Sequence, residues 1–214
     1  MDKNKLKLTV LLLFAVVPIS LATWYFSVRQ DAGSVDTTNK GVLVVPVLDI
    51  TDLGLLDTKG QVAYVPFDEL VKEVTPEEYK PRPWQLIYLG QSECDEVCVE
   101  RLYFLRQMHI RLGKESDRVE RVYVNASAGQ GALPARTNQL LGEEIPDLRI
   151  LAGDLELLQE KLARTVPAGT DPVEAHYIYV TDPVGNVMMY FTPANTIEEI
   201  FSDIDKLLDR SSLG

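Results

Sequence analysis

Hydrophobic and polar positions divide the chain into an apolar segment, a polar segment and a region of alternating elements. Residues 8–28 carry no formal charge and follow Lys3, Lys5 and Lys7. A helix rises about 1.5 Å per residue, so 21 residues would cross the roughly 30 Å hydrocarbon core of a bilayer. Because the lysines precede the span, we expect residues 1–7 to form a cytoplasmic stub and the rest of the chain to lie outside the cytoplasm.

This segment has a second interpretation, as a signal peptide cleaved after Ala22, where small residues follow an apolar stretch. Against cleavage, the apolar stretch continues through Trp24 and Tyr25, as in an uncleaved signal anchor. We therefore expect a single-pass protein of the inner (cytoplasmic) membrane with its domain in the periplasm or an equivalent compartment. In both cases the chain's two cysteines lie where a disulfide can persist.

The polar segment, residues 29–40, lacks apolar periodicity and is typical of a tether between a membrane and a domain. Residues 41–210 then show a succession of strand and helix patterns. The strand patterns fall at 42–45, 61–65, 84–90, 118–124, 175–180 and 187–191, with a further short apolar segment at 148–151. The helix patterns fall at 67–74, 94–112, 137–141, 154–162 and 197–208. This order predicts an α/β domain of the thioredoxin-like kind, with a mixed sheet flanked by helices.

The composition of the chain excludes some classes of function. The chain has 214 residues, 46% of them hydrophobic, which is enough for one ordinary core. Its formal net charge of -11 leaves no basic face to follow a phosphate backbone, so nucleic-acid binding is excluded as an interpretation. With only two cysteines the chain is not a disulfide scaffold, and these thiols are incidental, one bridge or one site.

Cys94 and Cys98 lie where an apolar strand meets the start of a helix. Residues four apart share one helix face, so both sulfurs can point at one spot, within reach of a disulfide. A helix amino terminus favours the thiolate, whereas Glu93, Asp95 and Glu96 oppose it. The sequence does not decide which effect is larger.

Two thiolates suit copper, which is a soft ion when monovalent, once an imidazole joins them. The chain has two histidines. His109 is about 17–22 Å from the cysteines along the predicted helix, so we expect a structural role for it. His176 starts a strand after a loop with Pro167, Gly169 and Pro172, where it could meet a neighbouring loop. Its position alone leaves both a structural role and a ligand role open.

A resemblance adds to these observations. Residues 84–90 before Cys94 and Cys98, the pairs Arg101-Leu102 and Arg106-Gln107, and residues 176–186 resemble the Sco/SenC family of membrane-anchored, thioredoxin-like copper proteins. The likeness covers about residues 45–210 and includes the anchor. Val99 stands where the family motif has proline, and Leu89-Gly90 replaces the usual end of the preceding strand, as in a divergent member.

The resemblance implies that Cys94, Cys98 and His176 bind copper, as Cu(I), Cu(II) or both. It also implies a role as a metallochaperone or assembly factor for the copper site of cytochrome c oxidase. The expected partner is the copper-bearing subunit of a respiratory oxidase or another copper-handling protein.

Two other functions stay open. In a thiol-disulfide oxidoreductase, one cysteine would attack a partner's disulfide and the other would resolve the mixed disulfide. The three residues between Cys94 and Cys98, rather than the two of thioredoxin-type enzymes, weaken this interpretation. In an assembly scaffold, Cys94 and Cys98 would form an inert bridge. Substitution of His176 distinguishes a copper protein from an oxidoreductase. It should matter greatly for a three-ligand copper site and little for disulfide exchange.

Overall fold

The structure, a computed structural model, describes residues 7, 12–14, 16–21, 23–24, 38–66, 69, 72, 82–91, 93–127 and 135–211. The chain divides into two compact units, residues 1–38 and 39–214. The described part of the first unit is helical at residues 7, 12–14, 16–21 and 23–24. Across the residues that the structure describes, no helix has the length and hydropathy of a membrane span. The predicted span over 8–28 lies partly outside these residues and stays a prediction.

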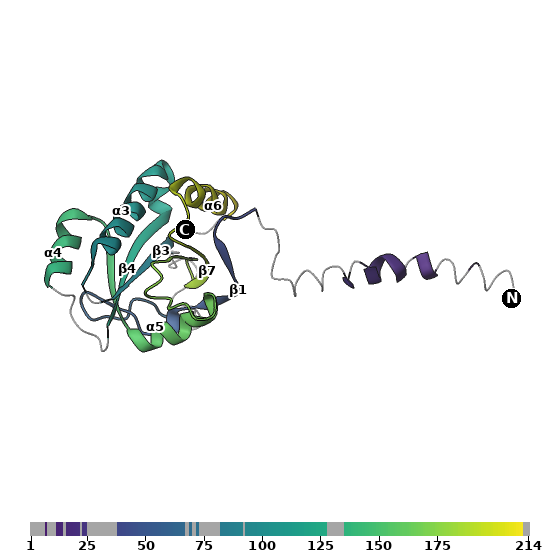
Figure 1. Ribbon diagram of the computed structural model, residues 1–214, viewed down its shortest axis with the longest axis horizontal. Coiled ribbons are helices and arrows are strands. Elements are labelled where there is room, and N and C mark those ends of the chain that lie inside the picture. Colours follow the sequence, from purple (N-terminus) through teal and green to yellow (C-terminus); the bar gives the residue numbers. More distant parts are fainter. Residues whose placement is uncertain are drawn as a thin grey trace. The chain divides into compact units, whose positions relative to one another are not determined.

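The second unit is built on one mixed sheet (Figure 1). Within the described residues its strand order is β1-β7-β6-β3-β4-β5-β2. Strands β3, β4 and β5 run parallel, whereas β6, β7 and β1 on one side and β2 on the other pair antiparallel with their neighbours. The strands are β1 (Val42–Asp49), β2 (Leu56–Asp57), β3 (Trp84–Gln91), β4 (Val119–Ser127), β5 (Arg149–Asp154), β6 (Ile178–Thr181) and β7 (Asn186–Phe191).

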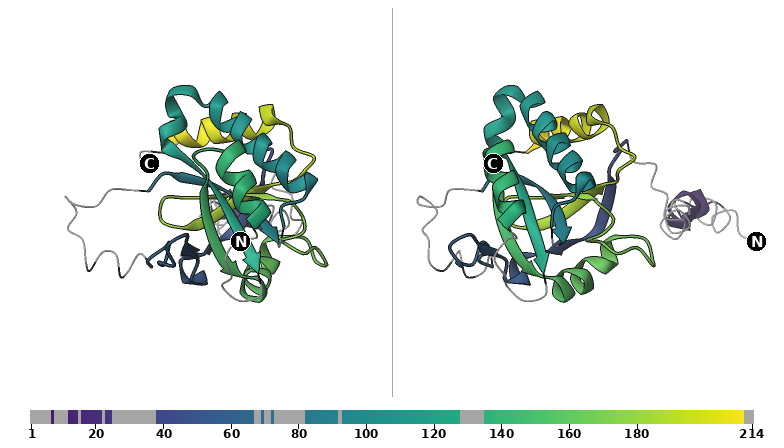
Figure 2. Two further views of the ribbon diagram at one scale, coloured as in Figure 1. Left: turned by 90° about the vertical axis from the view of Figure 1, so that its left-hand side faces the viewer. Right: turned by 60° about the vertical axis from the view of Figure 1, so that its left-hand side comes forward.

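Helices cover both faces of the sheet, as Figure 1 and Figure 2 show. They are α3 (Glu96–Arg111), α4 (Ala135–Glu144), α5 (Leu155–Leu162) and α6 (Ile197–Arg210). Short 3-10 turns are η1 (Thr51–Leu53), η2 (Gly113–Arg118) and η3 (Ala163–Thr165). Helices α3, α4 and α6 pack on one face and α5 on the other. The predicted thioredoxin-like arrangement, a mixed sheet flanked by helices, is confirmed.

Strand β3 shows how the sequence produces this layering. Its residues from Trp84 to Gly90 are buried, as expected for a central strand covered on both faces. Alternate side chains divide between the two cores: Leu86 and Tyr88 join the α3 side, while Ile87 and Leu89 join the α5 side. The continuous apolar run in the sequence therefore reflects burial from both directions.

Three predicted elements differ from the structure. The strand predicted at 61–65 is wrong, because only Val62 forms an isolated bridge, to Leu56. The Asp57 carboxylate accepts hydrogen bonds from the amides of Lys59 and Gln61, so a tight turn leaves little chain to pair. The strand predicted at 175–180 begins only at Ile178, because His176 has a left-handed backbone that ends the extended conformation. The apolar segment at 148–151, predicted without a type, belongs to strand β5. The helix predicted from Cys94 begins at Glu96. The helix predicted at 67–74 lies mostly outside the described residues.

The start of the second unit is tied to its last helix. The backbone amides of Lys40 and Gly41 donate to Oδ2 of Asp203, at 2.5 and 2.9 Å. The Asp203 side chain, on α6, is fully buried. One buried carboxylate therefore holds the chain where it enters the sheet.

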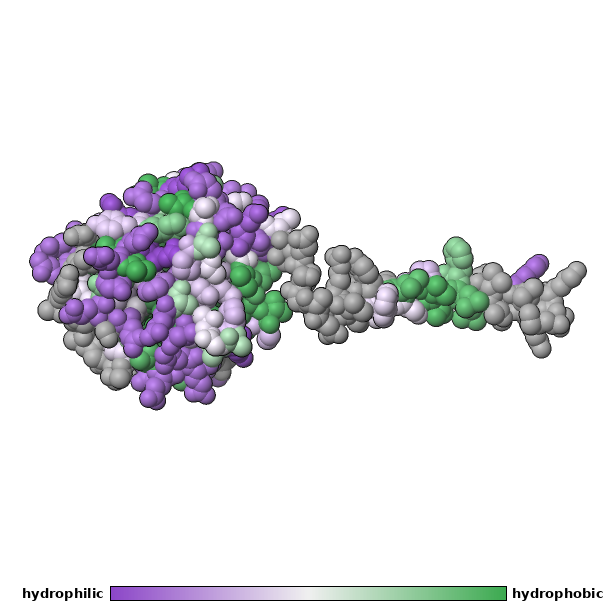
Figure 3. All heavy atoms as spheres, in the orientation of Figure 1, coloured by the Kyte–Doolittle hydropathy of each residue, from purple (hydrophilic) through white to green (hydrophobic). Residues whose placement is uncertain are grey.

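Strand β1, which follows, is an edge strand with exposed apolar side chains. In Figure 3 hydrophobic colour gathers over this strand, while much of the surrounding surface of the unit is hydrophilic. The exposed residues are Val42, Leu43, Val45 and Val47.

Candidate functional site

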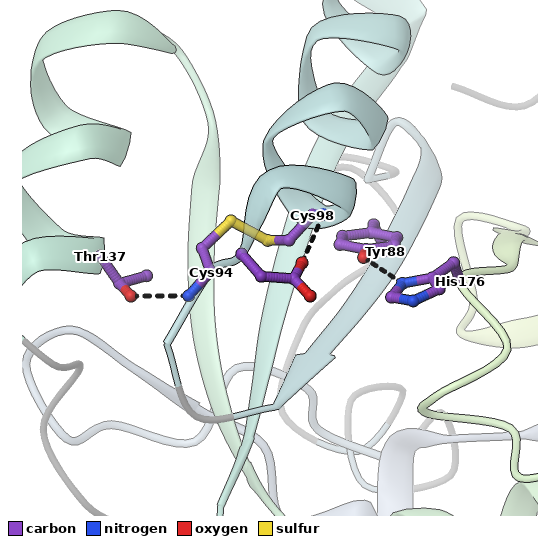
Figure 4. Close-up of a disulfide and its surroundings, with 6 residues drawn as sticks. Tyr88, Cys94, Cys98, Thr137 and His176 are labelled. Atoms are coloured by element: carbon purple, nitrogen blue, oxygen red, sulfur yellow. Dashed lines mark hydrogen bonds between the residues drawn. A yellow bond between two sulfur atoms is a disulfide. The ribbon is translucent and has the colours of Figure 1, made fainter.

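Cys94 and Cys98 form a disulfide at the amino end of α3, with their Cα atoms 5.2 Å apart. The pair is largely buried, with exposed fractions of 9% for Cys94 and 4% for Cys98. Cys94 is therefore the residue that a partner reaches more easily. Figure 4 shows the bond between the helix end and the neighbouring α4 segment.

Two hydrogen bonds hold the cysteine loop. The side chain of Asp95 caps α3 by accepting from the amide of Cys98 at 2.9 Å, which explains why the helix begins after Cys94. The amide of Cys94 donates to Oγ1 of Thr137 at 3.0 Å (Figure 4). Thr137 lies on α4, far away in the sequence, and no motif marks it. Sequence reasoning missed this contact, which only the packing of α4 beside α3 creates.

A pair of buried tyrosines lies beneath the site. The rings of Tyr88 on β3 and Tyr123 on β4 have centroids 6.2 Å apart. A Cβ atom at Gly90 would lie 2.6 Å from the Tyr123 hydroxyl, so only glycine leaves room for this ring. Burial raises the pKa of Tyr123 to about 12 and raises that of Tyr88 further above its usual value. Both hydroxyls therefore stay neutral at ordinary pH.

His176 lies just before strand β6, outside the strand itself. Strand β6 runs antiparallel to β3, and Ile178 pairs with Tyr88. This pairing brings His176, two residues before Ile178, close to the Tyr88 side chain. The backbone of His176 is left-handed, with φ of 54°.

The imidazole of His176 contacts Tyr88. Its Nδ1 lies 2.8 Å from the Tyr88 hydroxyl in a hydrogen bond, and the two rings are stacked with centroids 6.2 Å apart. Figure 4 shows Tyr88 between the disulfide and His176. The structure thus brings the three predicted ligands to one region, with a tyrosine between the histidine and the sulfurs.

The donor types fit copper, whereas the arrangement in the structure is that of the oxidised pair. Both sulfurs are bonded to each other, and among the described residues no three His, Cys, Asp or Glu side chains are grouped to hold a metal. When Nδ1–H of His176 donates to Tyr88, its Nε2 keeps a lone pair for a metal. Metal-binding histidines in proteins commonly have their second nitrogen bonded in this way.

The second histidine has a structural role, as expected. Nε2 of His109 lies 3.1 Å from the carbonyl oxygen of Ser116 and 2.8 Å from that of Val119. This contact joins the end of α3 to the start of β4, at the far end of the helix from Cys98.

Charge around the disulfide is mostly negative. Glu93, Asp95, Glu96 and Glu100 are exposed there. Arg101, one turn after Cys98, is instead buried, with 8% of its surface exposed. Its guanidinium lies 5.6 Å from the centroid of the Phe104 ring, and burial lowers its pKa. The sequence places Arg101 on the cysteine face of the helix, but its burial follows from tertiary packing.

Comparison with solved structures finds the same fold in several Sco proteins. Copper-bound yeast Sco1 is 16% identical, with a TM-score of 0.54 over 78% of this chain and 95% of that chain. Apo Sco1 from Thermus thermophilus is 17% identical, with a TM-score of 0.52 over 81% and 99%. BsSco, described with a disulfide switch, is 13% identical, with a TM-score of 0.50 over 82% and 98%. The predicted likeness to Sco proteins is thus confirmed for the fold.

Comparison with curated protein sequences gives no match. A family model does match, over residues 84–211, and these residues contain the disulfide, the tyrosine pair and His176. This match spans more than half of the chain. The chain therefore belongs to the family described as transmembrane-like, thioredoxin-like, C-terminal domain.

Proposed function

We propose that this protein binds copper through Cys94, Cys98 and His176 and serves the assembly of the copper site of cytochrome c oxidase. The observation that carries the proposal is that a local cysteine pair and a distant histidine lie on either side of one residue, Tyr88. Two thiolates and an imidazole form a donor set suited to monovalent copper. Cys94, the less buried of the two cysteines, is the ligand that a partner would reach first during metal transfer.

Copper binding in this protein depends on the redox state of the cysteine pair. The disulfide offers no thiolate, so it must first accept two electrons and two protons, giving two thiols, while a dithiol donor becomes a disulfide. Copper then displaces the thiol protons as it binds. The protein is therefore loaded only after the disulfide has been reduced.

The Sco structures support this proposal through what their descriptions say of those proteins. One is yeast Sco1 with copper bound. Another is BsSco, a member of a family of cytochrome c oxidase assembly proteins with a disulfide switch. Bound copper and a disulfide switch are thus both described for proteins of this fold.

The proposal includes a location and a partner. We place residues 8–28 across the inner membrane, with residues 1–7 in the cytoplasm, residues 29–40 as a tether and residues 41–210 in the periplasm. Lysines before the span support this orientation. The partner is the copper-bearing subunit of a respiratory oxidase or another copper-handling protein at the same membrane surface.

A thiol-disulfide oxidoreductase is the second candidate, favoured by the disulfide itself. A partner thiolate would attack Sγ of Cys94, which is the more exposed cysteine, and Cys98 would leave as a thiolate. A second partner thiolate would then release Cys94, so that the partner ends as a disulfide and this chain as a dithiol.

Copper uptake by the full chain in detergent, reduced and without oxygen, tests the proposal. We expect one copper per chain in the wild type and strongly weakened binding in Cys94→Ser, Cys98→Ser and His176→Ala. His109→Gln changes the chain's other histidine and should bind as the wild type does. A wild type that takes up no copper would refute the proposal. Oxidation of a partner dithiol to a disulfide by the disulfide form, unaffected by His176→Ala, would then support the second candidate.

A further inference from the structure

Arg101 is a buried cation whose charge is not matched within the described residues. None of the carboxylates that the structure describes lies within ion-pair distance of its guanidinium. The guanidinium instead lies over the ring of Phe104 and interacts electrostatically with the neighbouring Glu100. Removing an arginine from water without a counter-ion costs free energy, so such a residue calls for an explanation.

The position of Arg101 relative to the cysteine pair offers an explanation for this buried charge. Arg101 follows Cys98 by three residues within α3, so the two side chains lie on the same face of the helix. Both are buried in the structure. Arg101 also lies near enough to influence the pKa of Tyr88, whose hydroxyl is hydrogen-bonded to His176. The cation thus lies on the inner side of the proposed copper site, while the carboxylates of Glu93, Asp95 and Glu96 lie on its outer side.

The net charge of the site differs between its states. The disulfide is neutral. Two thiolates with Cu(II) and a neutral imidazole also sum to zero. Two thiolates with Cu(I) sum to one negative charge, which the exposed carboxylates nearby disfavour. Among these states, the Cu(I) form is therefore the one that a fixed positive charge stabilises.

We propose that Arg101 is a positioning residue that supplies the compensating charge for the Cu(I) form of the site. This inference rests on the proposed copper binding. Arg101 selects the oxidation state of the bound metal by its charge, without contacting the copper as a ligand. The chain places this cation inside the fold, where solvent screens it less than it would screen a surface lysine.

The charge effect can be estimated. One unit charge acting over about 10 Å through an effective dielectric constant of about 20 changes a binding constant by roughly tenfold. Arg101→Met keeps an unbranched side chain and removes the charge, so it should weaken Cu(I) binding by about tenfold. Cu(II) binding should change little, because the Cu(II) site is neutral. The Cu(II)/Cu(I) potential should therefore fall by about 59 mV, the equivalent of tenfold for one electron.

The experiment measures Cu(I) affinity by competition with a chromophoric chelator, Cu(II) affinity by competition with a second chelator, and the potential by mediated titration. The full chain in detergent is used for the wild type, Arg101→Met, Arg101→Lys and Arg106→Met. Arg106 lies on the same helix, more than one turn further from Cys98, so its variant controls for loss of an arginine. Thermal unfolding of each variant, measured with its disulfide intact, reports whether that variant folds.

The inference is supported when Arg101→Met selectively weakens Cu(I), while Arg101→Lys and Arg106→Met resemble the wild type. Equal loss of Cu(I) and Cu(II) binding in Arg101→Met would assign Arg101 a packing role and overturn the inference. Unchanged Cu(I) affinity would overturn it while leaving the proposed copper function intact. A wild-type protein that binds neither Cu(I) nor Cu(II) would refute both this inference and the proposed copper binding.

Discussion

Reduction of the Cys94–Cys98 bond should destabilise the fold only modestly. The bond closes a loop of five residues, counting both cysteines. In the chain-entropy description, closing such a loop lowers the entropy of the unfolded chain by about 7 cal/mol/K, or ~2 kcal/mol at 25 °C. For a unit of this size, each kcal/mol moves the unfolding temperature by roughly 2–4 °C. We therefore expect the reduced protein to unfold about 4–8 °C below the disulfide form.

The assay is thermal unfolding of both forms at the same pH, followed by circular dichroism and without metal. A Cys94→Ser/Cys98→Ser double variant should unfold near the reduced protein and should not respond to a dithiol reductant. The stability difference also equals the difference in disulfide reduction free energy between folded and unfolded chains. Equal unfolding temperatures would refute the loop-entropy reasoning, since the fold would then itself favour the dithiol by about 2 kcal/mol. A much larger difference would identify the bond as a structural bridge and count against reversible redox function.

Three further predictions follow from buried contacts. Asp203→Ala removes the acceptor of two backbone amides and should cost about 3 kcal/mol or more in urea unfolding; an unchanged midpoint would show that this carboxylate does not secure the start of the sheet. Gly90→Ala places a Cβ atom 2.6 Å from the Tyr123 hydroxyl and should cost about 1–3 kcal/mol, partly recovered by adding Tyr123→Phe; a double variant no more stable than Gly90→Ala would contradict this contact. Burial raises the pKa of Tyr64 and Tyr123 from 10.0 to about 12, so their contribution to stability is complete below pH 10 and is lost as the pH rises towards 12, because the unfolded tyrosines ionise first. Tyrosinate absorbance recorded with the unfolding midpoint checks this, and ionisation of all nine tyrosines of the folded chain near pH 10 would contradict it.

Elements with strong local signals could be predicted from the sequence. The hairpin between β6 and β7 is one example, because Asp182 accepts hydrogen bonds from the amides of Val184, Gly185 and Asn186 and closes the turn. The last helix is another, since Thr196 and Glu199 form a capping box before a regular apolar face. In both cases, neighbouring residues contain the information.

Features that depend on distant partners could not be predicted. Strand β5 is short, and its pairing with β4 and β2 decides its structure. The contact of Thr137 with the cysteine loop requires α4 to pack beside α3. The state of the two thiols also does not follow from the sequence, because the spacing of Cys94 and Cys98 shows only that their sulfurs can meet.

Strand register at His176 has a consequence for recognising related proteins. The histidine lies two residues before β6, whose pairing with β3 sets Ile178 beside Tyr88, and the chain between α3 and β6 does not enter into that pairing. Residues can be inserted or lost in the intervening loops without changing that pairing. A shift of the β6 pairing by one residue would instead turn the β6 side chains to the opposite faces of the sheet and move Ile178, with the preceding His176, away from Tyr88. Relatives that share this chemistry should therefore be sought by the alignment of the two strands, and a search for a constant Cys-to-His spacing would overlook them.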